Sequence, residues 1–95
     1  MKVLVVDDEF IIRVGIQTIL EQASGDYEYV GSAGNGKSAL KEIELLQPDI
    51  VITDIKMPFM DGLSLSEIVK EEFPRIRIII ISGYDDFEYA RQAIA

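Results

Sequence analysis

Short apolar runs alternate along the chain with segments whose apolar residues recur at helical spacing. Three runs, residues 3–6, 50–53 and 76–81, are rich in β-branched residues. Continuous runs of this kind are typical of parallel strands that are buried on both faces. Residues 27–33 partly alternate apolar and polar side chains, and Gly31 interrupts them, which favours a strand at an edge of the sheet. The pattern therefore predicts four strands.

Amphipathic helices are predicted between these strands and after the last one, from apolar residues three or four positions apart. We expect the third helix to begin near Gly62 or Leu63 and to end before Pro74. The alternation of strand and helix predicts an open α/β sheet with right-handed crossovers and helices on both faces. The four apolar stripes are Ile12, Ile16, Ile19 and Leu20; Ala39, Leu40, Ile43 and Leu46; Leu65, Ile68, Val69 and Phe73; and Phe87, Ala90 and Ile94.

Composition narrows the possible chemistry. The 95 residues are expected to form one domain, residues 1–95, with 17 Asp and Glu, nine Lys and Arg and a net charge of -8. This charge disfavours direct binding to nucleic acid. The absence of Cys and His excludes disulfides, Cys/His zinc sites and Ser-His-Asp catalysis. No apolar run is long enough for a signal peptide or a membrane span, so we expect a soluble, cytoplasmic protein whose carboxylates carry any chemistry.

Carboxylates follow the predicted strands at the points where those strands end. Asp7 and Asp8 follow the first strand, Asp54 ends the third, and Ser82 ends the fourth. Functional groups in open parallel sheets gather at the carboxyl ends of the strands. If the first, third and fourth strands are neighbours, these side chains converge, and the carboxylates then repel one another unless a cation or a proton is present. An all-oxygen ligand set of this kind favours Mg2+.

Simpler interpretations exist for several of these residues. Asp7, Asp8 and Glu9 are also typical of a helix N-terminus, where acidic residues interact well with the helix dipole. Ser82 is also typical of a polar turn residue. Asp54 is harder to explain structurally, because it follows a buried strand at a cost in desolvation and the next helix begins several residues later.

The combined motifs resemble the receiver domain of two-component response regulators. The matching segments are residues 3–9 (VLVVDDE), 48–54 (PDIVITD), 56–62 (KMPFMDG) and 79–83 (IIISG), which occur in this order and together extend over the whole chain. Residues 82–91 (SGYDDFEYAR) look most like regulators with an AraC-type DNA-binding output domain. The resemblance implies a doubly wound, flavodoxin-like fold with strand order 2-1-3-4-5, for which a receiver domain is itself a reference example.

The resemblance also implies a role for each candidate site residue. Asp54 is expected to accept a phosphoryl group from a phosphohistidine on a sensor histidine kinase, as a carboxylate nucleophile that forms an acyl phosphate. Asp8 and Asp54 are expected to bind Mg2+ directly, Asp7 through water, and Lys56 through its main-chain carbonyl. Ser82 matches the family's Thr/Ser, whose hydroxyl moves toward the phosphoryl oxygen. The expected function is a phosphorylation switch for a transcriptional output domain.

The chain departs from a full receiver because it ends within the fourth predicted strand/helix unit. We expect the fifth unit to be absent, together with the family's Lys that contacts the phosphoryl group, which leaves a sheet of order 2-1-3-4. Residues 76–81 then form an exposed apolar edge, and such edges recruit other chains. We therefore expect self-association through the fourth strand.

Two other functions are compatible with part of this pattern. A phosphotransfer-inactive interaction module with the receiver fold is one of them. A Mg2+-dependent aspartyl phosphatase of the haloacid-dehalogenase type is the other, but it requires a second Asp two positions after the nucleophile, where this chain has Lys56.

Overall fold

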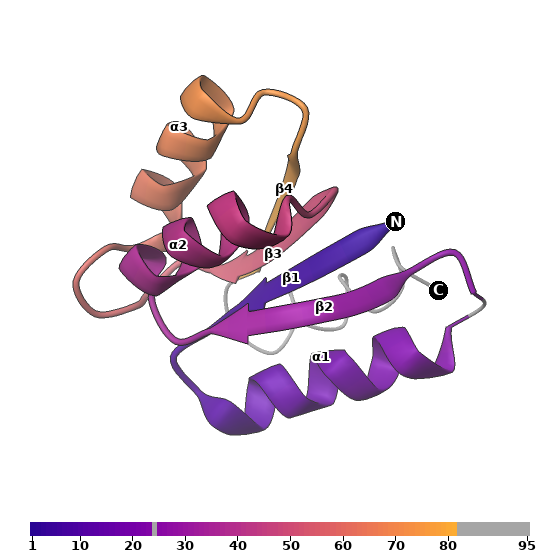
Figure 1. Ribbon diagram of the computed structural model, residues 1–95. Helices are drawn as coiled ribbons and strands as arrows, with labels where there is room; N and C mark the ends of the chain where they lie inside the picture. Colours follow the sequence, from indigo (N-terminus) through magenta and orange to yellow (C-terminus); the bar gives the residue numbers. More distant parts are fainter. Residues whose placement is uncertain (24, 82–95) are drawn as a thin grey trace.

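The computed structural model describes residues 1–23 and 25–81, which form a four-stranded parallel sheet with three helices (Figure 1). The strands lie in the order β2-β1-β3-β4, and every pair is parallel. The predicted α/β class and the expected strand order are therefore confirmed. The elements are β1 (Lys2–Val6), α1 (Phe10–Gln22), β2 (Glu28–Ala33), α2 (Gly36–Leu46), β3 (Ile50–Asp54), α3 (Gly62–Glu72) and β4 (Arg77–Ile81).

Helices cover both faces of this sheet, with α1 on one face and α2 and α3 on the other (Figure 1). The alternation of side chains along each strand divides the core accordingly. In β1, Val3 and Val5 pack with Ile16 and Leu20 of α1. The residues between them belong to a second cluster, which is made by Leu4, Val6, Ala33, Ala39, Ile43, Val51, Leu65 and Val69. The central strands are buried on both faces because each face has its own helical layer.

The fourth strand is less buried than the two central strands, as expected for residues 76–81 at an edge of the described sheet. Ile78, Ile79 and Ile80 are only half-buried, whereas Val3 to Val6 and Ile50 to Thr53 are buried. Within residues 1–23 and 25–81, β4 is hydrogen-bonded to β3 alone, so its other edge has no strand partner there. The predicted fourth helix, with Phe87, Ala90 and Ile94, lies outside the described residues.

The edge position predicted for the second strand is confirmed. Its pairing with β1 shifts after Tyr29, because Val3 lies opposite Tyr29 while Leu4 lies opposite Gly31. One extra residue in an edge strand produces a β-bulge. A Cβ placed on Gly31 would lie only 3.1 Å from Leu46 Cδ1, so the glycine also permits close packing of α2.

Two of the three described helices begin with the same side-chain cap, and α1 does not. Asn35 caps α2 by accepting a hydrogen bond from the Ser38 N–H, and Asp61 caps α3 through the Ser64 N–H. Glu9 precedes α1, but its side chain makes no capping hydrogen bond. The start of α3 at Gly62 confirms the predicted boundary. None of the helices among the described residues has the length and apolar character that a membrane span needs.

Candidate functional site

Three carboxylates meet at the edge of the sheet where β1 and β3 end. These strands are adjacent, and Val6 lies opposite Thr53, so the residues that follow both strands emerge at the same level. Asp7, Asp8 and Asp54 each offer a carboxylate oxygen within 4.8 Å of the other two. The convergence expected for these three residues is therefore observed. Ser82, the fourth residue expected here, lies outside the described residues.

Asp7 is the buried member of this acidic cluster, with only 3% of its surface exposed. Its Oδ1 accepts a hydrogen bond of 2.8 Å from the Glu9 N–H, which stabilises the charged form. Burial outweighs this bond and, together with repulsion from the carboxylates of Asp54, Asp8 and Glu9, raises the pKa of Asp7 to about 6. The charged form of Asp7 is therefore costly while no cation is bound.

Asp54 is half-buried at the last position of β3. Its Oδ1 accepts a hydrogen bond of 2.7 Å from the Ile55 N–H. Thr53 behind it is fully buried, and the Thr53 hydroxyl donates to the Asp54 carbonyl oxygen at 3.0 Å. The backbone of Asp54 is thus held by the core, while its carboxylate is accessible beside the exposed carboxylate of Asp8.

The loop from β3 to α3, residues 55–61, packs tightly against Asp54. The Gly62 N–H donates to the Ile55 carbonyl at 2.8 Å. A Cβ on Gly62 would overlap the Asp54 carbonyl oxygen and lie 2.9 Å from its carbonyl carbon. The contact with Asp54 therefore imposes a packing requirement at position 62 that only glycine meets.

Two further contacts shape the same loop. Phe59 has a φ of 71°, and the Met60 N–H donates to the Pro58 carbonyl at 2.8 Å, which is the pattern of a γ-turn centred on Phe59. Met60 packs on Gly36, where a Cβ would lie 2.8 Å from the Met60 side chain. Lys56 is exposed on this loop, two residues beyond Asp54.

The donor set fits Mg2+. All three converging side chains supply oxygen, and Mg2+ is held in proteins by a small number of carboxylates together with water. A divalent cation would also offset the repulsion that raises the pKa of Asp7. The backbone carbonyl of Lys56 belongs to the loop beside the cluster, but its role as a ligand stays a prediction. Asp61 is separate from this site, because it caps α3 and its pKa is lowered by hydrogen bonds from Ser64.

Arg13 is a neighbour of the site that the sequence pattern did not single out. Its Nη1 donates a hydrogen bond of 2.6 Å to the Asp7 carbonyl, and its guanidinium lies 5.6 Å from the centre of the Phe10 ring. An Arg in the first turns of an amphipathic helix is usually solvated, so its type and position carry no signal for this contact.

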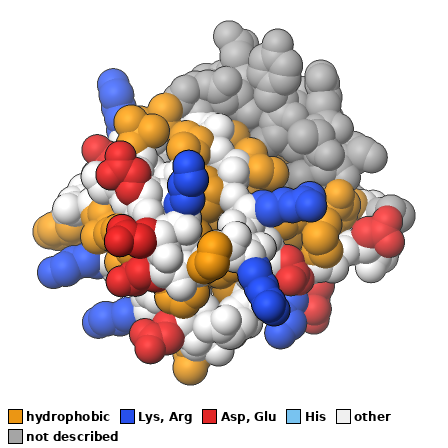
Figure 2. Space-filling model, turned by 90° about the horizontal axis from the view of Figure 1, so that it is seen from above, with side chains coloured by type: hydrophobic (Ala, Val, Ile, Leu, Met, Phe, Trp, Pro, Cys, Tyr) orange, Lys and Arg blue, Asp and Glu red, His pale blue; other side chains and the backbone are white. Residues whose placement is uncertain are grey.

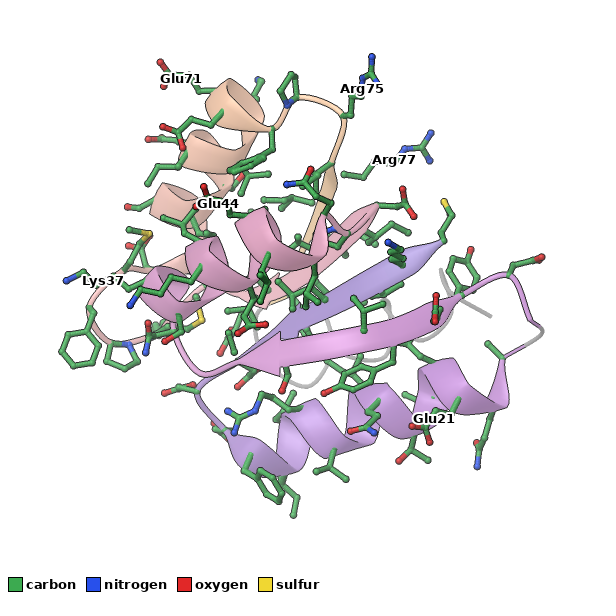
Figure 3. The ribbon with its side chains drawn as sticks, in the orientation of Figure 1. Glu21, Lys37, Glu44, Glu71, Arg75 and Arg77 are labelled. Atoms are coloured by element: carbon green, nitrogen blue, oxygen red, sulfur yellow. The ribbon has the colours of Figure 1, made fainter. Side chains whose placement is uncertain are left out.

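Charged side chains of both signs are distributed over the face of the molecule seen from above (Figure 2). Figure 2 shows acidic, basic and hydrophobic side chains interspersed over the face seen from above. In Figure 3, Lys37 extends from the start of α2 toward solvent, whereas Arg75 and Arg77 lie at the other end of the molecule, near the beginning of β4. The charges on this face are therefore mixed, unlike a continuous basic surface for nucleic acid.

Comparison with known sequences matches residues 3–95 to the family described as the response regulator receiver domain. The transcriptional regulatory protein YesN of Bacillus subtilis is 45% identical over 93 residues, which are 98% of this chain and 25% of YesN. The response regulator protein VraR of Staphylococcus saprophyticus is 37% identical over 84 residues, which are 88% of this chain and 40% of VraR. The chain thus spans between a quarter and less than half of the length of these relatives.

Solved structures agree with the sequence comparison. The receiver (REC) domain of AraT, a response regulator from Geobacillus stearothermophilus, superposes with a TM-score of 0.80 at 41% identity, covering 98% of this chain and 72% of that one. A structure of the response regulator RcsB in complex with DNA gives a TM-score of 0.81 at 30% identity, covering 90% of this chain and 45% of that one. The similarity extends over nearly the whole of this chain.

Proposed function

The chain belongs to the response regulator receiver domain family, and from that premise we propose that Asp54 accepts a phosphoryl group from a phosphohistidine of a sensor histidine kinase. The protein is a signal-transduction domain of the two-component type. The observation that carries the proposal is the convergence of Asp54 with Asp7 and Asp8 at the carboxyl edge of the sheet.

The environment of Asp54 suits a carboxylate nucleophile. A carboxylate oxygen forms a bond to phosphorus while the bond from phosphorus to the imidazole nitrogen breaks, and the product is an acyl phosphate. Asp54 is half-buried, so its carboxylate is reachable, and its backbone is held by Thr53 and by the packing of Gly62. Such positioning supplies much of the rate enhancement in phosphoryl transfer.

Asp8 and Asp54 would hold Mg2+ directly, Asp7 would hold it through water, and the Lys56 main-chain carbonyl would complete the protein ligands. When bound, Mg2+ neutralises negative charge between the carboxylates and the phosphoryl oxygens. Asp7 is suited to binding Mg2+ through water, because it is more buried than Asp8 and Asp54 and its Oδ1 already accepts a hydrogen bond from the Glu9 N–H. We propose that the hydroxyl of Ser82 moves toward the phosphoryl oxygen when Asp54 is phosphorylated.

The domain's chemistry is confined to its own phosphorylation and slow dephosphorylation, which switch an output domain on the same chain. YesN is named as a transcriptional regulatory protein and the RcsB structure contains DNA, which supports a DNA-binding output, with an AraC-type domain as the specific prediction. The net charge of -8 supports an output domain, rather than this one, as the part that contacts DNA. We place this function in the cytoplasm, in keeping with the two-component family.

The proposal is tested by intact-mass analysis after incubation with Mg2+ and a small-molecule phosphodonor. The wild-type protein is expected to gain one phosphoryl group, and Asp54→Asn is expected to gain none. The matched control is Asp61→Asn, which makes the same chemical change at the end of the loop that follows Asp54 and keeps an oxygen that can cap α3.

Labelling of the control together with loss of labelling in Asp54→Asn and in a chelated sample supports the proposal. Labelling that persists in Asp54→Asn, or that does not depend on Mg2+, contradicts it. A wild-type protein that binds Mg2+ but is never labelled supports the interaction module instead.

A further inference from the structure

Arg13 links three segments at the carboxyl edge of the sheet. It lies in α1 and is half-buried, and its Nη1 donates to the Asp7 carbonyl oxygen at 2.6 Å. Its guanidinium stacks at 5.6 Å on the ring of Phe10, which is itself 69% exposed. A Cβ placed on Gly34 would lie 3.6 Å from the same Nη1, so the guanidinium lies close to the turn that follows β2.

The bond from Arg13 acts on one particular peptide unit. The Asp7 carbonyl belongs to the planar peptide that joins Asp7 to Asp8, so holding its oxygen sets the plane from which Asp8 projects. The Asp7 N–H donates to the Ala33 carbonyl at 3.0 Å, and the Asp7 carboxylate accepts from the Glu9 N–H. Asp8 is exposed between these fixed points. Its position therefore depends on the backbone at Asp7.

Arg13 stabilises the turn before α1 and not the helix N-terminus itself, because a guanidinium only donates hydrogen bonds and the free groups of a helix N-terminus are N–H donors. The Glu9 side chain makes no capping hydrogen bond, and the first turn of α1 carries no acidic residue. Arg13 reaches back from the helix and satisfies a carbonyl in the preceding loop, with Phe10 covering one face of the guanidinium.

We propose that Arg13 is a positioning residue that holds the Asp7–Asp8 peptide in the orientation in which Asp8 binds a divalent cation. The inference rests on the proposed function, because it concerns the same metal site. In this role Arg13 acts through the backbone of Asp7 and not through a contact of its own with the metal or the phosphoryl group.

The direction in which the Mg2+ affinity changes when Arg13 is replaced distinguishes a positioning role from an effect of its charge alone. Arg13 brings a positive charge close to a cluster that is proposed to bind a cation. If its charge alone mattered, removing it would make Mg2+ bind more tightly. If its hydrogen bond positions Asp8, removing it makes Mg2+ bind more weakly.

The test is a calorimetric titration of Mg2+ alone into metal-free wild-type protein and three variants. Arg13→Met keeps the unbranched stem but loses both charge and donor, and its Kd is expected to rise about fivefold, the factor that one ordinary hydrogen bond contributes to an equilibrium. Arg13→Lys keeps a cationic donor and is expected to fall between wild type and Arg13→Met. Lys37→Met removes the same charge from an exposed position at the start of α2 and is expected to leave the Kd unchanged or slightly lower.

A second readout is local and does not depend on metal. The backbone order parameter of Asp8 in metal-free protein, measured by 15N relaxation, is expected to fall in Arg13→Met, while that of Asp54 stays constant. Unfolding by urea shows that each variant is folded under the conditions of titration.

The outcomes distinguish the inference from the function on which it rests. Wild-type protein that binds no Mg2+ overturns the metal site and the inference with it. Wild-type binding together with an Arg13→Met Kd equal to or below that of Lys37→Met overturns the inference alone. Wild-type-like binding by Arg13→Lys with tighter binding by Arg13→Met also overturns it, because charge then accounts for the result.

Discussion

The buried carboxylate of Asp7 lowers the stability of the folded protein while no metal ion is bound. Its side chain is almost fully buried, and burial raises its pKa from 3.8 to about 6. Since the folded-state pKa is above the unfolded value, the folded protein binds more protons than the unfolded one between these two values. The free energy of unfolding therefore falls as pH rises from about 4 to about 6 and stays lowered at neutral pH.

Replacing Asp7 by Asn removes this cost while keeping an oxygen for the Glu9 N–H. In metal-free buffer at pH 7.5, Asp7→Asn is expected to raise the free energy of unfolding by about 1–3 kcal/mol. Raising the pKa of Asp7 from 3.8 to about 6 corresponds to about 3 kcal/mol, and solvent screening reduces this figure. At pH 4.5 the gain is expected to be clearly smaller. Urea denaturation in the presence of a chelator measures both values.

Asp61→Asn is the control for this prediction, because hydrogen bonds from Ser64 lower rather than raise the pKa of Asp61. It is expected to give no gain at pH 7.5. An Asp7→Asn variant that is destabilised at pH 7.5, or that gains equally at both pH values, contradicts the interpretation of Asp7 as a costly buried charge.

At the scale of elements, the site depends on how closely α3 follows β3. Gly62 is the first residue of α3 and lies against the Asp54 carbonyl, while Gly36, the first residue of α2, accommodates Met60 of the same loop. The loop of residues 55–61 contains Phe59 at positive φ, and this conformation costs a residue with a side chain about 1–2 kcal/mol. The packing of two helix N-termini thus holds a strained loop beside Asp54, the proposed phosphoacceptor.

Gly62→Ala is expected to displace the Asp54 backbone, because the added Cβ has no room beside the Asp54 carbonyl. A loss of about 2 kcal/mol in the free energy of unfolding is expected from this overpacking, together with slower labelling of Asp54. Urea denaturation and time-resolved intact mass measure the two effects.

Gly25→Ala provides the matched control, since a Cβ there meets nothing within 4 Å. It is expected to leave both stability and labelling close to wild type. If Gly62→Ala behaves like Gly25→Ala, the close contact between α3 and Asp54 is not a constraint on the site.

At the scale of the whole molecule, the two edges of the described sheet differ. The β2 edge carries a bulge, which hinders pairing with another chain. The β4 edge is regular and rich in isoleucine, and it borders a groove of about 260 Å³ between α3 and β4. The groove is lined by Ser66, Val69, Lys70, Pro74, Ile76, Ile78 and Ile80.

Self-association of the chain therefore stays a prediction, and we expect it to occur through β4. Sedimentation velocity is expected to show a mean mass that rises with concentration, and Ile80→Lys is expected to weaken this rise by placing a charge in the groove. Leu45→Lys, on the exposed side of α2, is the control and is expected to have no effect. A compact monomer at the highest concentration would argue against the prediction.

The local sequence pattern was sufficient to predict the strands and helices of the described residues and to identify the acidic residues of the site. The β-branched runs predicted the positions of β1, β3 and β4 to within a residue or two, and Gly31 indicated the edge strand. The pattern also predicted that α3 begins near Gly62. Periodicity and strand ends are properties of neighbouring residues, so a single sequence contains them. The roles of Asp54, Lys56 and Ser82 came from the family resemblance and stay predictions until they are measured.

Contacts between segments were decided only by the tertiary structure. The half-burial of Ile78 depends on what lies beside β4, and the bulge in β2 depends on its register against β1. Arg13 and Gly62 were not identified as parts of the site because their partners, the carbonyls of Asp7 and Asp54, are backbone groups that every residue possesses. The sequence by itself determined which residues carry charge and where each strand ends. The approach of one backbone to another determined how those charges are held, because that geometry depends on packing across the whole fold.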